Sequence, residues 1–98
     1  MIWRMAKVAG AIDTVVRHVL ETVIQTLPTF KFQNSAGKEM AIRDLAGLAR
    51  SVQAATSVRQ GARIDEGNVR SLEQRLSVIE ADATAMLGQL AKAAAGST

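Results

Sequence analysis

A repeat of apolar side chains near the C-terminal end of the sequence sets the strongest limit on the fold. Its members alternate in steps of three and four residues, so in a helix they would line one narrow stripe. They are Val69, Leu72, Leu76, Ile79, Ala83, Met86 and Leu90, hereafter the seam. These are a and d positions of a heptad, and the charged Glu73, Arg75 and Glu80 fall at the flanking e and g positions. The pattern predicts a helix that pairs with another helix, as in a coiled coil.

The same register can be traced back toward the middle of the chain, through a segment that contains two glycines. Position a then falls on Leu48 and on later alanines, whereas Asp65 occupies a d position. We therefore expect one long helix and coiled coil over residues 43–95. The alternative is a turn at Gly61–Gly67 between antiparallel helices, with Asn68 as the N-cap of the second. That turn would allow a three-helix bundle folded within one chain.

Residues 1–28 carry an apolar stripe of their own, which predicts an amphipathic N-terminal helix. Pro28 should end this helix, because the residue before a proline disfavours the α region. The members of the stripe that we expect to dock on a partner are Ile2, Met5, Ile12, Val16, Val19 and Val23. In the alternative intrachain bundle, this stripe would pack within the same chain.

Residues 29–42 have the alternating pattern of a small β-hairpin. Phe30 and Phe32 alternate with polar residues before the turn candidate Asn34–Gly37, and Met40 and Ile42 alternate after it. A hairpin would place these four apolar side chains on one face. The alternative is a helix that starts at Asn34 or at the next residue. The fold class that we predict is therefore mainly α, with a C-terminal coiled coil and a possible hairpin, and with a frayed tail at 96–98.

Charge and hydropathy do not favour a nucleic acid or a membrane as the partner. The net charge is only +3, and the signs are mixed at close spacing, as on a solvated helix face. The charge-free stretch Thr22–Phe30 is far shorter than the roughly 20 residues of a spanning helix, and no signal peptide is recognisable. We expect a soluble protein. An alternative is a membrane-surface protein in which Trp3, Arg4 and Lys7 seat the first helix at the lipid interface.

The chain lacks the residue patterns that enzymes, metal sites and cofactor sites require. It contains no cysteine, and His18 is its one histidine, without evident partners for a metal site or a catalytic triad. Asp13 and Glu21 lie eight residues apart, which fits solubilising charges better than paired catalytic carboxylates. We predict no enzymatic activity, no cofactor, no metal and no small-molecule substrate.

The stretch Arg63-Ile64-Asp65, followed by the run from Val69 to Leu76 (VRSLEQRL), resembles the short coiled-coil segments of bacteriophage tail and fibre proteins. The resemblance covers about a third of the chain and rests on composition. It implies a structural subunit of a virion that assembles as a homotrimer through the C-terminal helix, while the N-terminal helix docks on other structural proteins. A small helical-bundle adaptor or regulatory protein is the alternative function.

Overall fold

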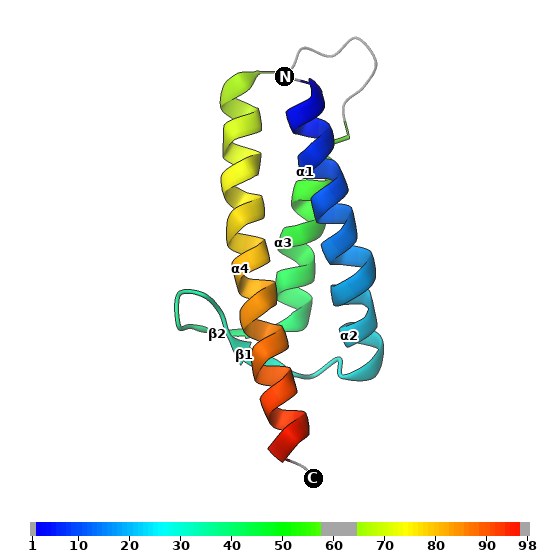
Figure 1. Cartoon of the computed structure of the whole chain (residues 1–98), viewed down its shortest axis with the longest axis vertical. Helices are drawn as coiled ribbons and strands as arrows, with labels where there is room; N and C mark the ends of the chain where they lie inside the picture. Colours follow the sequence, from blue (N-terminus) through cyan, green and yellow to red (C-terminus); the bar gives the residue numbers. More distant parts are fainter. Residues whose placement is uncertain (1, 58–64, 97–98) are drawn as a thin grey trace.

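The structure, a computed structural model, describes residues 2–57 and 65–96, with Ile2 and Trp3 described by their backbone alone. The described part is mainly α-helical with one small antiparallel hairpin, which confirms the predicted mainly α class and the hairpin but not the coiled coil. The helices lie side by side as an elongated three-helix bundle of 53 × 25 × 18 Å (Figure 1). The N-terminal helix and the C-terminal helix run in the same direction, and the central helix runs opposite to both.

The first helical segment is a continuous rod made of α1 (Ile2–Val15), the π-helical turn η1 (Val16–Leu20) and α2 (Glu21–Thr26), hereafter the N-terminal rod. Its buried residues include a run at four-residue steps, Val8, Ile12, Val16 and Leu20. In an α-helix each such step rotates the stripe by about 40°. The wider π turn, in which the Glu21 N–H donates to the Val16 carbonyl, offsets this rotation and keeps the stripe facing the bundle.

The N-terminal rod ends where the sequence predicts. The last helical residue is Thr26, and Leu27, directly before Pro28, has left the helical region with φ −138° and ψ 66°. The hairpin follows, with β1 (Lys31–Gln33) paired antiparallel to β2 (Glu39–Ala41). The prediction of a hairpin within 29–42 is confirmed, and the alternative helix start is not adopted.

The hairpin turn is closed by an asparagine side chain and a glycine. Asn34 Oδ1 accepts the backbone N–H groups of Ala36 at 2.9 Å and of Lys38 at 3.0 Å. Gly37 has φ +78°, a left-handed conformation that favours glycine. In the paired strands Phe32 lies opposite Met40, and Phe32 is buried against the helices. The apolar face of the hairpin therefore belongs to the same core as the bundle.

Helix α3 (Ile42–Ala55) continues directly from β2 and ends at Thr56. The Thr56 N–H donates to the carbonyl of Val52, and its hydroxyl donates to that of Gln53. The residues of α3 that enter the core are Ile42, Leu45, Ala46, Ala49 and Val52. The heptad register traced back to Leu48 is therefore wrong for this helix, because Leu48 lies on its exposed side.

Helix α4 (Glu66–Gly96) begins at an N-cap, since Asp65 Oδ1 accepts the N–H of Gly67 at 2.9 Å. It packs against α3, which one continuous helix over both segments cannot do. The prediction of a single helix over 43–95 is therefore wrong. Gly61 lies outside the described residues, and Asp65, not Asn68, caps the second helix. Asp65, a short polar residue that accepts a backbone hydrogen bond, interrupts the apolar heptad repeat at the start of α4. The alanines at neighbouring a positions keep the heptad phase across this boundary by chance.

Candidate functional site

The seam is buried, but its partner is the protein's own chain. Val69, Leu72, Ile79, Ala83 and Met86 belong to the common core with residues of the N-terminal rod and α3. Leu76 and Leu90 are only partly buried and pack at the edge of that core. Heptad spacing identifies which face of a helix is covered, and it does not identify the helix that covers it.

The stripe expected to dock on a partner also lies inside the bundle. Met5, Ile12, Val16 and Val23 are buried, and Val19 is partly buried. The side chain of Ile2 lies outside what the structure describes. The expected docking stripe is therefore covered mainly by α3 and α4, and of its described members Val19 alone stays partly exposed.

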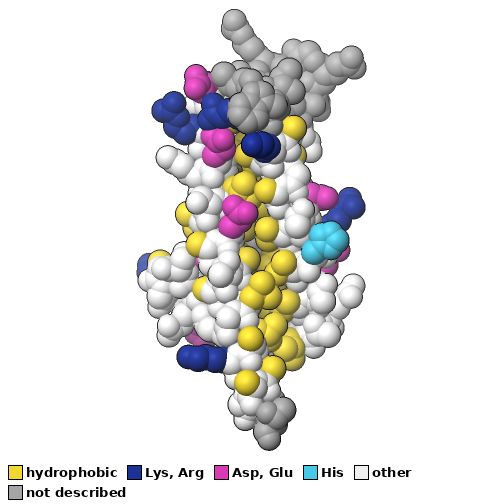
Figure 2. Space-filling view, in the orientation of Figure 1, with side chains coloured by type: hydrophobic (Ala, Val, Ile, Leu, Met, Phe, Trp, Pro, Cys, Tyr) yellow, Lys and Arg dark blue, Asp and Glu magenta, His cyan; other side chains and the backbone are white. Residues whose placement is uncertain are grey.

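Two polar contacts establish which side of the N-terminal rod faces which helix. Arg4 is bonded to Glu73 of α4, whereas Asp13 accepts a hydrogen bond from Gln53 of α3 at 3.0 Å. Val15 lies eleven residues after Arg4, three helical turns along the same side, and thus faces the junction with α4. This junction, the front face, is the one seen in Figure 2.

The front face carries an apolar band that the bundle leaves partly open. Figure 2 shows hydrophobic side chains running along the junction of the N-terminal rod and α4 and continuing into the lower half of the molecule. By helical spacing from Arg4 and Glu73, Val15, Leu76 and Leu87 lie on this side of their helices. Val15, Val19, Leu76 and Leu90 are partly buried, and Leu87 is 42% exposed. These five residues are hereafter the front band. Seam residues thus contribute to an exposed surface as well as to the core.

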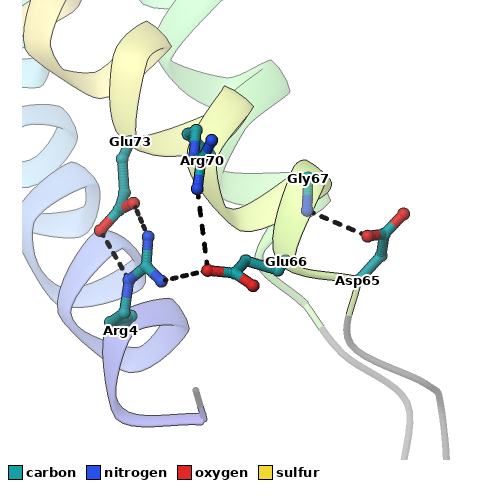
Figure 3. A network of polar contacts seen from close by, with 6 residues as sticks. All are labelled: Arg4, Asp65, Glu66, Gly67, Arg70 and Glu73. Atoms are coloured by element: carbon teal, nitrogen blue, oxygen red, sulfur yellow. Dashed lines mark hydrogen bonds and ion pairs between the residues drawn. The ribbon is translucent and has the colours of Figure 1, made fainter.

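A network of charged side chains closes the upper end of the front band (Figure 3). Arg4 donates two hydrogen bonds to the Glu73 carboxylate and approaches Glu66 at 3.6 Å, which in turn lies 3.8 Å from Arg70. The hydrogen bond from Arg4 lowers the pKa of Glu73 below its ordinary value, and the same bond raises the pKa of Arg4. The network joins the first turns of α1 and α4, so the lower part of the band is the open part.

A second exposed apolar site lies between α3 and α4, on another side of α4. Leu48 is 45% exposed and Val78 is 54% exposed, and they line one groove of about 270 Å³. The groove is lined by Leu48, Ser71, Gln74, Arg75, Val78 and Ile79. It is hereafter the rear groove. Its lining is mostly apolar, with one charged group, Arg75, at its edge.

Sequence reasoning missed two polar contacts that attach the hairpin to α4. Asp82 is 2% exposed and accepts hydrogen bonds from the backbone N–H, at 2.8 Å, and the hydroxyl of Ser35. The Gln89 amide accepts from the N–H of Gln33 at 2.8 Å and donates to its carbonyl at 2.7 Å. The sequence did contain one indication that Asp82 is buried. It lies three residues after Ile79 and four before Met86, which places its carboxylate beside the apolar seam.

The described residues show no arrangement that points to bound-metal chemistry. No group of three or more His, Asp or Glu side chains among residues 2–57 and 65–96 is placed to hold a metal ion. His18 lies exposed on η1, beside an ion pair between Arg17 and Asp13 at 3.2 Å. Over the same ranges, no helix has an apolar stretch long enough to cross a bilayer. Comparison with protein-family models, with curated proteins and with solved structures gave no match.

Proposed function

We propose that this protein is a non-catalytic assembly subunit that binds an amphipathic helix of another subunit along the front band. The observation that carries the proposal is the exposure of Leu87, at 42%, between two seam residues, Leu76 and Leu90, that the bundle only partly covers. Two helices side by side with an apolar junction between them form the surface on which a further helix packs. This surface includes two residues of the seam, Leu76 and Leu90, for which heptad spacing predicts pairing with another helix.

The band also indicates the chemistry of the partner helix. Glu80 lies four residues after Leu76 and seven before Leu87, so it shares their side of α4. Glu80 is exposed and makes no ion pair with a basic side chain among the described residues. The partner is then a helix with apolar residues at spacings of three and four and with a lysine or arginine opposite Glu80.

A virion tail or fibre is one assembly in which such a subunit would serve, as the resemblance to phage coiled-coil segments implies. Within this proposal, the contact between subunits differs from a seam-to-seam coiled coil. Five seam residues are already buried in the chain, so only Leu76 and Leu90 remain available at the band. A homotrimer would therefore form by packing of front bands, with the bundle intact.

The proposal is tested by site-specific photo-crosslinking in the cells that naturally make the protein. A benzophenone amino acid replaces Leu87, and the matched control carries it at Ser77, an exposed position on the outer side of α4. We expect a discrete crosslinked subunit from position 87 and none from position 77. The substitution Glu80→Lys should weaken that crosslink, because it would repel the basic partner. Equal crosslinking from both positions, or no crosslink from position 87, would refute the proposal.

A further inference from the structure

The rear groove is a second exposed apolar surface that the proposed function does not use. Exposed leucine and valine side chains on neighbouring helices are individually common on protein surfaces. Here Leu48 and Val78 are roughly half exposed and line the same groove, above the buried Ile79. The side chains around them, Ser71 and Gln74, are small or uncharged. The groove therefore has the shape and polarity of a helix-packing surface.

Two opposite charges beside this groove make no ion pair with one another or with any other described residue. Arg75 donates a hydrogen bond to the neutral Ser51 hydroxyl at 2.7 Å and makes no ion pair with an acidic side chain of the described residues. Asp44 is exposed in the first turn of α3 and likewise makes no ion pair there. Asp44 and Ser51, the α3 partner of Arg75, lie on the groove side of α3, since residues 44, 48 and 51 follow one another at helical spacing.

The placement of these charges explains why they do not pair with each other. Arg75 is held at Ser51, three residues after Leu48, and Asp44 is four residues before it. The rise of about 1.5 Å per residue separates the two levels by about 10 Å along α3. The side of α3 that faces the groove therefore has Arg75 near one end and Asp44 near the other, with Leu48 near the middle. A second copy turned end over end presents the opposite order of charge.

We propose that a second copy of this chain docks on the rear groove about a two-fold axis that crosses α3 near Leu48. The two α3 helices then run antiparallel, and Leu48 of each copy meets Leu48 of the other. Asp44 of each copy faces Arg75 of the other, so the same ion pair forms twice. This is an isologous interface, in which one self-complementary surface serves both copies. It is independent of the front band and leaves that band open in both copies.

The size of the surface indicates that the dimer is weak. The 14 residues of α3 span about 21 Å, and two adjacent helices are about 20 Å wide, so each copy contributes on the order of 400 Å². Interfaces of this size fall below the usual range for stable dimers. A concentration-dependent equilibrium between monomer and dimer is the expected behaviour.

The test is sedimentation equilibrium of the purified full chain at about 0.1 M ionic strength, where the Debye length is about 10 Å, over a wide concentration range and with charge-reversed variants. We expect the single variants Asp44→Arg and Arg75→Asp each to raise the dimer Kd about tenfold or more, because two attractive contacts become repulsive. The double variant should restore the dimer, because the contact re-forms with reversed signs. The matched control is Arg50→Asp, the same charge change on the opposite exposed side of α3, and it should leave the Kd within about twofold.

Three results would overturn this inference, provided that circular dichroism shows folded variants. They are a monomer at every concentration, a dimer that the charge reversals affect no more than Arg50→Asp does, and a double variant as weak as the singles. A dimer weakened by Glu80→Lys but not by the reversals would place the contact between copies on the front band instead. The three overturning results do not themselves bear on crosslinking at Leu87, so the proposed function is tested separately.

Discussion

Adjacent residues of α4 provide the sharpest comparison of buried and exposed positions in the bundle. Ile79 is 2% exposed and belongs to the core, whereas Val78, one residue earlier, is 54% exposed. Both are β-branched aliphatic residues in the middle of the same helix, so substitution by alanine changes helix propensity in the same direction. A difference in stability between the two variants therefore reports their packing.

The expected magnitude follows from the carbon atoms that each substitution removes. Ile79→Ala removes three buried carbons, worth about 0.8 kcal/mol each, and leaves a cavity that adds to this loss. The better helix propensity of alanine returns a few tenths of a kcal/mol. The net loss in the free energy of unfolding is about 3 kcal/mol, or a fall in Tm of roughly 12–24 °C for a chain of this length. Val78→Ala should stay within about 0.5 kcal/mol of the original protein.

Urea and thermal unfolding, followed by circular dichroism at low protein concentration, measure both variants where any weak dimer has dissociated. The reasoning would be refuted if the two variants lost similar stability, or if Ile79→Ala cost less than about 1 kcal/mol. It would also fail if the unfolding midpoint of the original protein rose steeply with concentration, because the seam would then be buried between molecules.

Three further predictions concern the hairpin and the charged network. Replacing Gly37, which has φ +78°, by alanine should lower the free energy of unfolding in urea by about 1 kcal/mol, and an unchanged value would contradict the left-handed conformation at this position. Arg4 lowers the folded-state pKa of Glu73, so the ion pair stabilises the fold above the ordinary carboxyl pKa, and this stabilisation is lost as the pH falls through the lowered pKa. Glu73→Gln should therefore make the free energy of unfolding less dependent on pH in the acid range. An unchanged pH dependence would exclude the network as its source. Gln89→Ala should speed hydrogen exchange of the Gln33 amide, measured by NMR, while exchange in the core stays slow, and unchanged exchange at that amide would contradict the contact.

Elements with a local cause could be predicted from the sequence. The hairpin follows from alternation around a turn with an asparagine and a glycine, and the end of the first helix follows from Pro28. The covered face of α4 follows from heptad spacing, which is also local. Each of these features is determined by residues within a few positions of one another.

Features that depend on contacts between distant segments could not be predicted in the same way. Small alanines at consecutive a positions kept the heptad phase across a helix boundary, and the capping role of Asp65 became evident only from its bond to Gly67. The choice between a partner chain and the same chain depends on whether the helices fold back, which periodicity does not encode. Asp82 is buried because Ser35, 47 residues away, supplies its hydrogen bonds.

The central claim is that the seam faces the protein's own chain while other surfaces remain for partners. Isotope-filtered NOE spectroscopy on a mixture of labelled and unlabelled protein tests it directly, because it separates contacts within one molecule from contacts between molecules. We predict that the methyl groups of Ile79 and Met86 show contacts to the N-terminal rod and α3 only within one molecule. Contacts between a labelled and an unlabelled molecule at Ile79 or Met86 would contradict the claim and restore an intermolecular seam.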